Sequence, residues 1–173
     1  FDAQAMDKGI NVLKSMGFNI FVPQDIFKQK RYLAGDDALR ADVINRLFSD
    51  SEIKAIICAR GGYGALRVLS RLDWNIIKQN PKPFIGYSDI TALLTAIVNE
   101  TGVPVIHGPN VVSLASADKD TLNSFFQALT GGQTSLLVPE CRAIRSGRAE
   151  GLLTGGNLAT LSHLMGTGFQ ADF

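Results

Sequence analysis

The chain has few cysteines, almost no net charge and no apolar run long enough to span a membrane. Its two cysteines, Cys58 and Cys141, lack the spacing of metal ligands. Lys and Arg (17) nearly balance Asp and Glu (16) without a long basic run, which argues against nucleic-acid binding. We therefore expect no metal, no other cofactor, no nucleic-acid partner and no membrane partner.

Cys58 lies in an apolar run, and we expect it to be a buried thiol on a central strand. So few cysteines suit a reducing, cytoplasmic compartment. The hydrophobic share of 46% is enough for a packed core and too high for a disordered tail.

Strand and helix signals alternate along the chain. The hydrophobic periodicity predicts helices over 3–16, 36–48, 65–69, 90–98, 118–129 and 159–165 and strands over 18–22, 53–59, 84–85, 103–106 and 134–138. This alternation favours an α/β fold with a doubly wound, mainly parallel sheet and helices on both faces. We expect an α/β domain over 1–139, followed by a linker and the start of a second domain over 140–173.

A short apolar strand turns into a helix at Ser88. Phe84 and Ile85 supply the strand, and Gly86 can adopt the backbone angles of a sharp turn. Such an elbow exposes the serine and surrounds it with N–H groups, as nucleophilic acyl transfer requires. Serine is also a preferred N-cap residue, and Ile90 stands where the G-x-S-x-G pattern has its second glycine. The pattern alone leaves both interpretations open.

A glycine-rich loop, Arg60–Gly64, directly follows the strand predicted over 53–59. Because the carboxyl ends of parallel strands meet at one edge of a sheet, we expect this loop to lie near Ser88. Arg67 stands where a dinucleotide-binding G-x-G-x-x-G would need a glycine, and no Walker A lysine is present. The loop either brings its N–H groups to a substrate carbonyl or carboxylate, or is only a tight turn.

Two histidines, His107 and His163, are the available imidazole bases. No spacing connects either one to Ser88. A second glycine loop, Gly155-Gly156-Asn157, precedes the last predicted helix and has the composition of a turn with a capping asparagine.

With these motifs in place, the chain resembles the serine LD-carboxypeptidases, a family of muramoyl-tetrapeptide carboxypeptidases and microcin-immunity hydrolases. The segments that carry the resemblance are 59–65, 72–74, 80–93, 107–109 and 151–158. They occur in the family's order over nearly the whole chain.

The resemblance implies that Ser88 is a nucleophile. It also implies an oxyanion hole formed by the N–H of Asp89 and an N–H of Gly61 or Gly62. Further candidates for substrate contact are Arg60, Tyr87, Gly155, Gly156 and Asn157. The implied enzyme is cytoplasmic, has two domains and is usually a homodimer; it releases D-alanine from a murein tetrapeptide, a muropeptide substrate, during wall recycling.

Two alternatives remain at this point: a microcin-immunity-type hydrolase of peptidyl nucleotides, and a non-catalytic α/β module that binds a ligand. The family's catalytic glutamate and histidine belong to a C-terminal domain and find no match up to Phe173, and the family's first strand finds none either. We therefore expect residues 1–173 to be an inactive fragment, and we assign neither His107 nor His163 to the role of the base.

Overall fold

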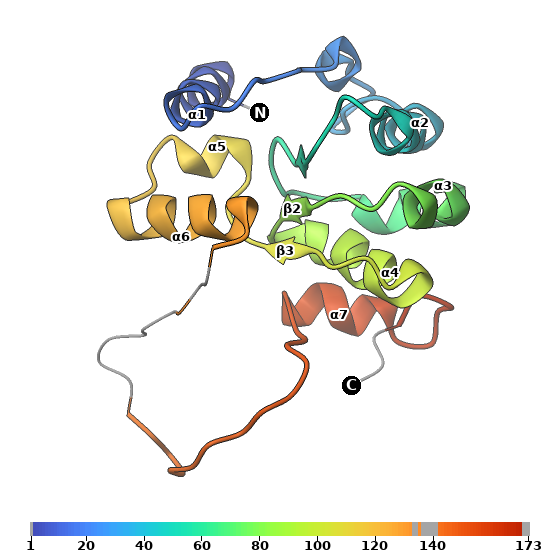
Figure 1. Cartoon of the computed structure of the whole chain (residues 1–173). Coiled ribbons are helices and arrows are strands. Elements are labelled where there is room, and N and C mark those ends of the chain that lie inside the picture. Colours follow the sequence, from blue (N-terminus) through green and yellow to red (C-terminus); the bar gives the residue numbers. More distant parts are fainter. Residues whose placement is uncertain (1, 133–134, 136–141, 171–173) are drawn as a thin grey trace.

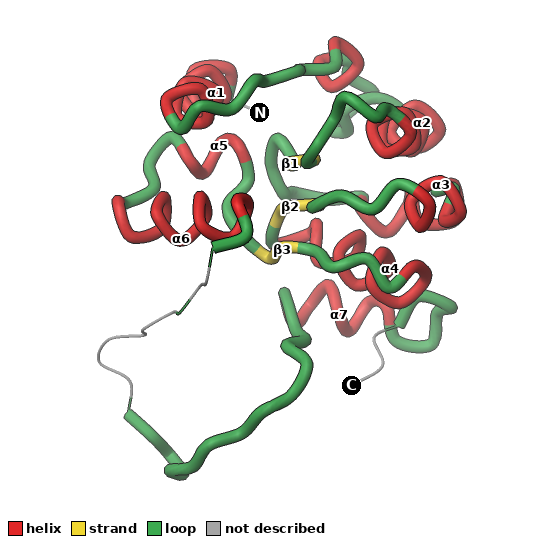
Figure 2. The backbone as a smooth tube through the Cα atoms, in the orientation of Figure 1, coloured by secondary structure: helices red, strands yellow, loops and turns green. Residues whose placement is uncertain are grey.

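The centre of the molecule is a small parallel sheet. The computed structural model describes residues 2–132, 135 and 142–170. The strands are β1 (Ile56–Ile57), β2 (Phe84–Gly86) and β3 (Ile106–His107), in the order β1-β2-β3. They lie side by side in Figure 2, with Ile56 opposite Phe84 and Ile85 opposite Ile106.

Helices surround this sheet (Figure 1). They are α1 (Ala3–Ser15), α2 (Asp37–Ser49), α3 (Trp74–Gln79), α4 (Thr91–Thr101), α5 (Val111–Leu114), α6 (Lys119–Thr130) and α7 (Leu158–Leu164), with the 3₁₀ helices η1 (Gln24–Phe27), η2 (Ala65–Arg71) and η3 (Ser88–Ile90). Every α-helix here except α4 begins at an Asp or Asn whose side chain accepts a free backbone N–H. None of the described helices is long and apolar enough to cross a membrane.

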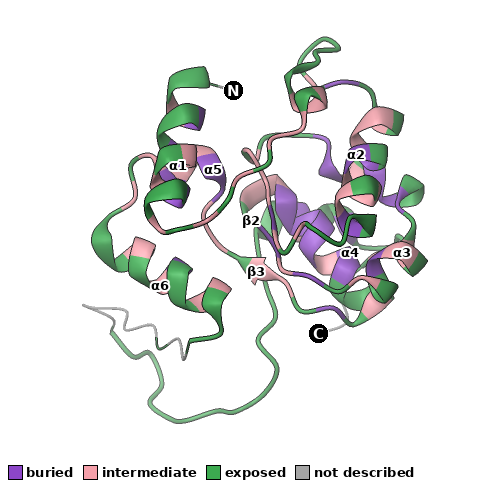
Figure 3. Ribbon diagram, turned by 45° about the horizontal axis from the view of Figure 1, so that its top comes forward, coloured by how far each residue is buried: buried purple, intermediate pink, exposed green. Residues whose placement is uncertain are grey.

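The sheet separates two hydrophobic cores. Phe84 faces a core formed mainly by α2, η2, α3, α4 and α7, and Ile85 faces a core formed by α1, α5 and α6. Figure 3 shows buried residues on the sides of the helices that face the sheet. The large side chains at these centres are Phe48, Ile77, Ile97 and Leu164 on one side and Leu13, Leu114 and Phe125 on the other. The predicted α/β fold, a parallel sheet with helices on both faces, is confirmed.

Two of the strand predictions are wrong. No strand forms over 18–22; Phe18, Ile20 and Val22 alternate toward the second core, so the alternation reflects burial without sheet pairing. β1 is also not central: within the described residues it pairs only with β2, so Cys58 follows an edge strand. The strand predicted over 134–138 lies outside the described residues except for position 135, as does Cys141.

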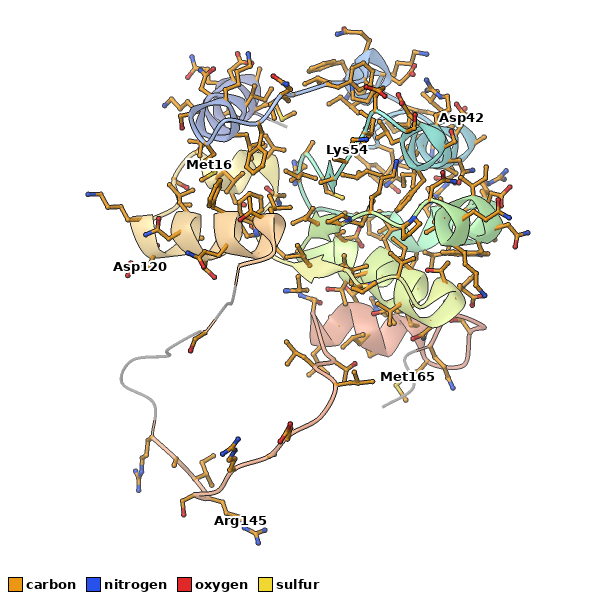
Figure 4. All side chains as sticks on the ribbon, viewed as in Figure 1. Met16, Asp42, Lys54, Asp120, Arg145 and Met165 are labelled. Carbon is orange, nitrogen blue, oxygen red and sulfur yellow. The ribbon has the colours of Figure 1, made fainter. Side chains whose placement is uncertain are left out.

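The chain beyond α6 returns to the folded body through α7. Residues 142–159 are exposed, and Figure 4 shows Arg145 on the part of this stretch that lies away from the helices. Helix α7 then packs beside α4 and contributes the fully buried Leu164 to the first core. The domain boundary at 139/140 stays a prediction.

Candidate active site

Ser88 adopts a backbone conformation that serine rarely uses. Its φ of 65° lies in the left-handed region, just after β2. The turn is tight at Gly86. A Cβ on this residue would lie 2.7 Å from Cγ2 of Ile90, so only glycine fits there. Backbone strain of this kind costs about 1–3 kcal/mol and occurs preferentially at functional sites. The predicted elbow is therefore present, and its serine is the strained residue.

The hydroxyl of Ser88 does not cap a helix. Within the described residues no hydrogen bond engages its Oγ, and neither η3 nor α4 has a side-chain cap. The other α-helices show that this chain caps helices with Asp and Asn. The capping interpretation of Ser88 is therefore wrong.

The glycine loop lies directly against this elbow. A Cβ on Gly61 would lie 3.1 Å from the Ser88 Cβ and 3.5 Å from its Oγ. Gly62 and Gly64 have φ values of 132° and 100°, which side chains disfavour. Gly64 also precedes η2, so the loop is a strand-to-helix turn as well as a close neighbour of Ser88. The prediction that both loops meet at one sheet edge is confirmed.

Backbone donors at this edge lack a hydrogen-bond partner among the described residues. The N–H groups of Gly61, Gly62 and Asp89 donate no hydrogen bond to any described residue. Such N–H groups beside a serine hydroxyl are the elements of an oxyanion hole. The arrangement can stabilise negative charge that develops on a carbonyl attacked by Ser88.

A cavity of about 670 Å³ opens beside Ser88. Of the residues predicted from the sequence, it is lined by Arg60, Gly61, Gly62, Tyr87 and Ser88. The rest of its wall comes from the start of α1 and from α5 with the residues around it, namely Asp2, Gln4, Ala5, Lys8, Asn110, Val112, Ser113, Ala115 and Ser116.

Sequence reasoning missed this second wall. Lys8 lies on the exposed face of α1, where a lysine is ordinarily a solvated group, and no local motif sets it apart. It reaches the cavity because α1 packs against α5. With Arg60 it gives the cavity two cations, against the one carboxylate of Asp2. The lining is therefore suited to a ligand that carries carboxylates.

The side chain of Asp89 points to the glycine loop. Its Oδ2 accepts the N–H of Ala65 at 2.9 Å, and the residue does not line the cavity. The contribution expected of Asp89 to chemistry is thus its backbone N–H. The carboxylate joins the elbow to the loop.

Neither histidine lines the cavity. His107 ends β3 as an exposed residue opposite Gly86, and His163 is exposed on α7. Within the described residues, no imidazole is therefore placed among the groups around Ser88.

The second glycine loop packs on the start of α4. A Cβ on Gly156 would overlap Thr91, and the N–H of Asn157 donates to the Thr91 Oγ1 at 3.0 Å. Asn157 also caps α7 by accepting the N–H of Thr160. Neither glycine nor the asparagine lines the cavity, and their contact with substrate stays a prediction.

The cysteine near this edge is not a second nucleophile. Burial raises the pKa of the Cys58 thiol to about 12, although part of the residue surface stays exposed. The thiol is therefore neutral near pH 7 and unreactive.

The described part of the chain also holds no group of three or more His, Cys, Asp or Glu side chains that could bind a metal ion.

Comparison with known proteins places this chain in a family. Residues 1–108 match the family described as the LD-carboxypeptidase N-terminal domain. A probable murein peptide carboxypeptidase from Bacillus subtilis is 36% identical over 99% of this chain and 55% of its own length. The microcin C7 self-immunity protein MccF from Escherichia coli is 29% identical over 95% of this chain and 57% of its own.

The fold agrees with these sequence matches. The crystal structure of muramoyltetrapeptide carboxypeptidase from Oxalobacter formigenes superimposes with a TM-score of 0.85 at 29% identity, covering 100% of this chain and 59% of that one. The chain spans little more than half the length of the curated relatives it matches.

Proposed function

This chain belongs to the LD-carboxypeptidase family, and we propose that the protein containing it is a serine carboxypeptidase that releases the terminal D-alanine of a murein tetrapeptide. The observation that carries the proposal is the strained Ser88, which lines a cavity with several polar side chains and lies beside N–H groups that donate to no described residue. The names of the relatives support the choice of a murein peptide as substrate.

In this mechanism the Ser88 Oγ attacks the carbonyl carbon of the L,D-peptide bond. The N–H of Asp89, with that of Gly61 or Gly62, stabilises the oxyanion of the tetrahedral intermediate. D-alanine leaves with a proton on its amine, and water then hydrolyses the acyl-enzyme to release the shortened peptide.

The serine hydroxyl needs a base to take its proton. Because neither histidine lines the cavity, we assign the base to residues outside 1–173, as the family's Ser–Glu–His triad suggests. The glutamate orients that histidine in the same way that a triad carboxylate does in other serine hydrolases.

The charges of the cavity support a substrate with carboxylates. Lys8 and Arg60 line the cavity as cations that can attract the terminal carboxylate of the peptide, and Gln4 and Asn110 add hydrogen-bonding groups to the wall. We also propose, from the family resemblance, that the protein acts in the cytoplasm during wall recycling and is a homodimer.

A hydrolase of peptidyl nucleotides is the second candidate, because MccF is among the relatives. A non-catalytic binding module is less well supported. It would have no use for a serine in a strained conformation whose hydroxyl engages no described residue.

The test is the release of D-alanine by the full-length protein and by Ser88→Ala. We expect kcat to fall by several orders of magnitude while stability changes by about 1 kcal/mol or less. Ser15→Ala, on the exposed face of α1, is the matched control and should keep full activity. Near-normal turnover by Ser88→Ala would remove Ser88 from the mechanism. Faster hydrolysis of a peptidyl nucleotide than of the tetrapeptide would favour the second candidate.

A further inference from the structure

One peptide unit at the end of the glycine loop is held from both sides by charged side chains. The C=O of Gly64 accepts a hydrogen bond from Arg40 Nη1 at 3.0 Å. The N–H of the same peptide unit, on Ala65, donates to Asp89 Oδ2 at 2.9 Å. Arg40 belongs to α2, and Asp89 follows Ser88 on the elbow. The loop is thus fastened to two separate parts of the fold.

The guanidinium in this arrangement is itself fixed. The Arg40 side chain is only 20% exposed, and its Nη1 lies 3.7 Å from Asp37 Oδ1. Asp37 in turn accepts a bidentate pair of hydrogen bonds from the guanidinium of Arg67 in η2. Desolvation lowers the pKa of Arg40, while the charges of Asp37 and Asp89 oppose that effect.

The close approach of Arg40 depends on a glycine. A Cβ on Gly64 would lie 3.1 Å from Arg40 Nη1 and 3.0 Å from Cδ2 of Leu33, and φ there is 100°. The loop residues before it are less restrained, because the N–H groups of Gly61 and Gly62 donate to no described residue and the C=O of Gly61 accepts from the adjacent Arg60 Nε at 3.1 Å. We call Arg40, the Asp89 carboxylate and the Gly64–Ala65 peptide unit that they hold the clamp. The clamp is therefore the nearest fixed point downstream of the proposed oxyanion donors.

We propose that Arg40 and the carboxylate of Asp89 are positioning residues, which hold the glycine loop at the distance from Ser88 that oxyanion stabilisation requires. This inference rests on the proposed function of Ser88. The two side chains touch neither substrate nor reacting atoms; they act through the Gly64–Ala65 peptide unit. Asp89 then serves the reaction twice, with its N–H toward the oxyanion and its carboxylate toward the loop.

The experiment compares Asp89→Ala with Asp89→Asn in the full-length enzyme. Asparagine keeps an acceptor oxygen for the Ala65 N–H, whereas alanine removes it. We expect Asp89→Ala to lower kcat by about 10²-fold with little change in KM, since misplacing a catalytic group by about 1 Å costs that much. Asp89→Asn should recover most of the loss. Arg40→Met should lower kcat in the same direction as Asp89→Ala.

The matched control is Asp42→Asn, a carboxylate on the exposed side of α2 (Figure 4). It pairs with Arg46 and lies outside the clamp, so kcat should not change.

A second measurement does not depend on activity. Amide hydrogen exchange at Ala65 should accelerate in Asp89→Ala and stay slow in Asp89→Asn. Normal kcat or unchanged exchange in a folded Asp89→Ala would overturn the inference. If Asp89→Ala does not fold, a loss of kcat in folded Asp89→Asn as severe as that of Ser88→Ala would also overturn it. Turnover by Ser88→Ala would defeat the proposed function instead, and the exchange result would still decide whether the clamp exists.

Discussion

Replacing Gly61 with alanine perturbs the contact between the glycine loop and Ser88. The new Cβ would lie 3.1 Å from the Ser88 Cβ and 3.2 Å from the Tyr87 carbonyl oxygen. These distances are shorter than an ordinary contact of 3.4–4 Å, so loop and elbow must separate by a few tenths of an ångström. The φ of Gly61 is not in the left-handed region, and crowding is the main effect expected.

The size of the effect follows from hydrogen-bond geometry. Oxyanion donors work at about 2.7–3.1 Å, and loss of one donor costs about 2.7–4 kcal/mol of transition-state stabilisation. A shift of a few tenths of an ångström moves a donor to the weak edge of that range. We therefore expect kcat of Gly61→Ala to fall by up to about 10²–10³-fold, with KM nearly unchanged.

The assay is steady-state release of D-alanine from a murein tetrapeptide by the full-length enzyme. Gly147→Ala is the control, because a Cβ there meets nothing within 4 Å and φ is not positive. If Gly61→Ala raises KM and leaves kcat intact, the loop only binds substrate and its role as an oxyanion donor is refuted.

Three further predictions concern stability and activity. Lys82 is 8% exposed and donates hydrogen bonds to the carbonyls of Leu47 and Asp50 at the end of α2. Lys82→Met should therefore lower the free energy of unfolding by about 2–3 kcal/mol. An unchanged melting temperature would contradict this prediction. Folding raises the pKa of Cys58 from 9.0 to about 12, so the stability due to its neutral thiol is complete below pH 9 and is lost as the pH rises toward 12. Denaturant titrations should therefore show a flatter alkaline decline for Cys58→Ala than for the unmodified protein, and equal slopes would argue against the shift. Purified residues 1–173 should not hydrolyse the tetrapeptide, because neither His107 nor His163 lines the cavity; turnover by this segment would require a base within it.

The meeting of the two loops could be predicted from the sequence because it follows from topology. Ser88 and the loop Arg60–Gly64 each follow a parallel strand, and parallel strands end at one edge. The conformation of Ser88 could not be predicted in the same way. A capping serine and a strained serine share one local pattern, and they are distinguished by the φ of Ser88 and by the absence of a side-chain cap on η3 and α4 among the described residues.

Predictions based on alternation alone were less secure. The segment 18–22 alternates because one side packs on the second core, and burial of one side does not require a hydrogen-bonded neighbour. Lys8 gave no signal at all, since its place in the cavity depends on the packing of α1 against α5. Contacts between elements far apart in the sequence decide such positions.

The clamp on the glycine loop was likewise invisible in the sequence. Arg40 and Gly64 are 24 residues apart, and so are Ala65 and Asp89. No local motif joins them, although each residue lies in or beside a segment that the sequence had marked for other reasons.

Covalent labelling of Ser88 tests most directly whether this residue is an activated nucleophile. The full-length protein would be treated with a serine-directed fluorophosphonate, digested and sequenced by mass spectrometry, with Ser88→Ala treated in parallel. A nucleophile deprotonated by a base reacts with such a reagent, whereas an ordinary serine hydroxyl does not. We predict one label per chain, on Ser88, and none on the variant. A protein that hydrolyses the tetrapeptide while Ser88 stays unlabelled would contradict the proposed mechanism.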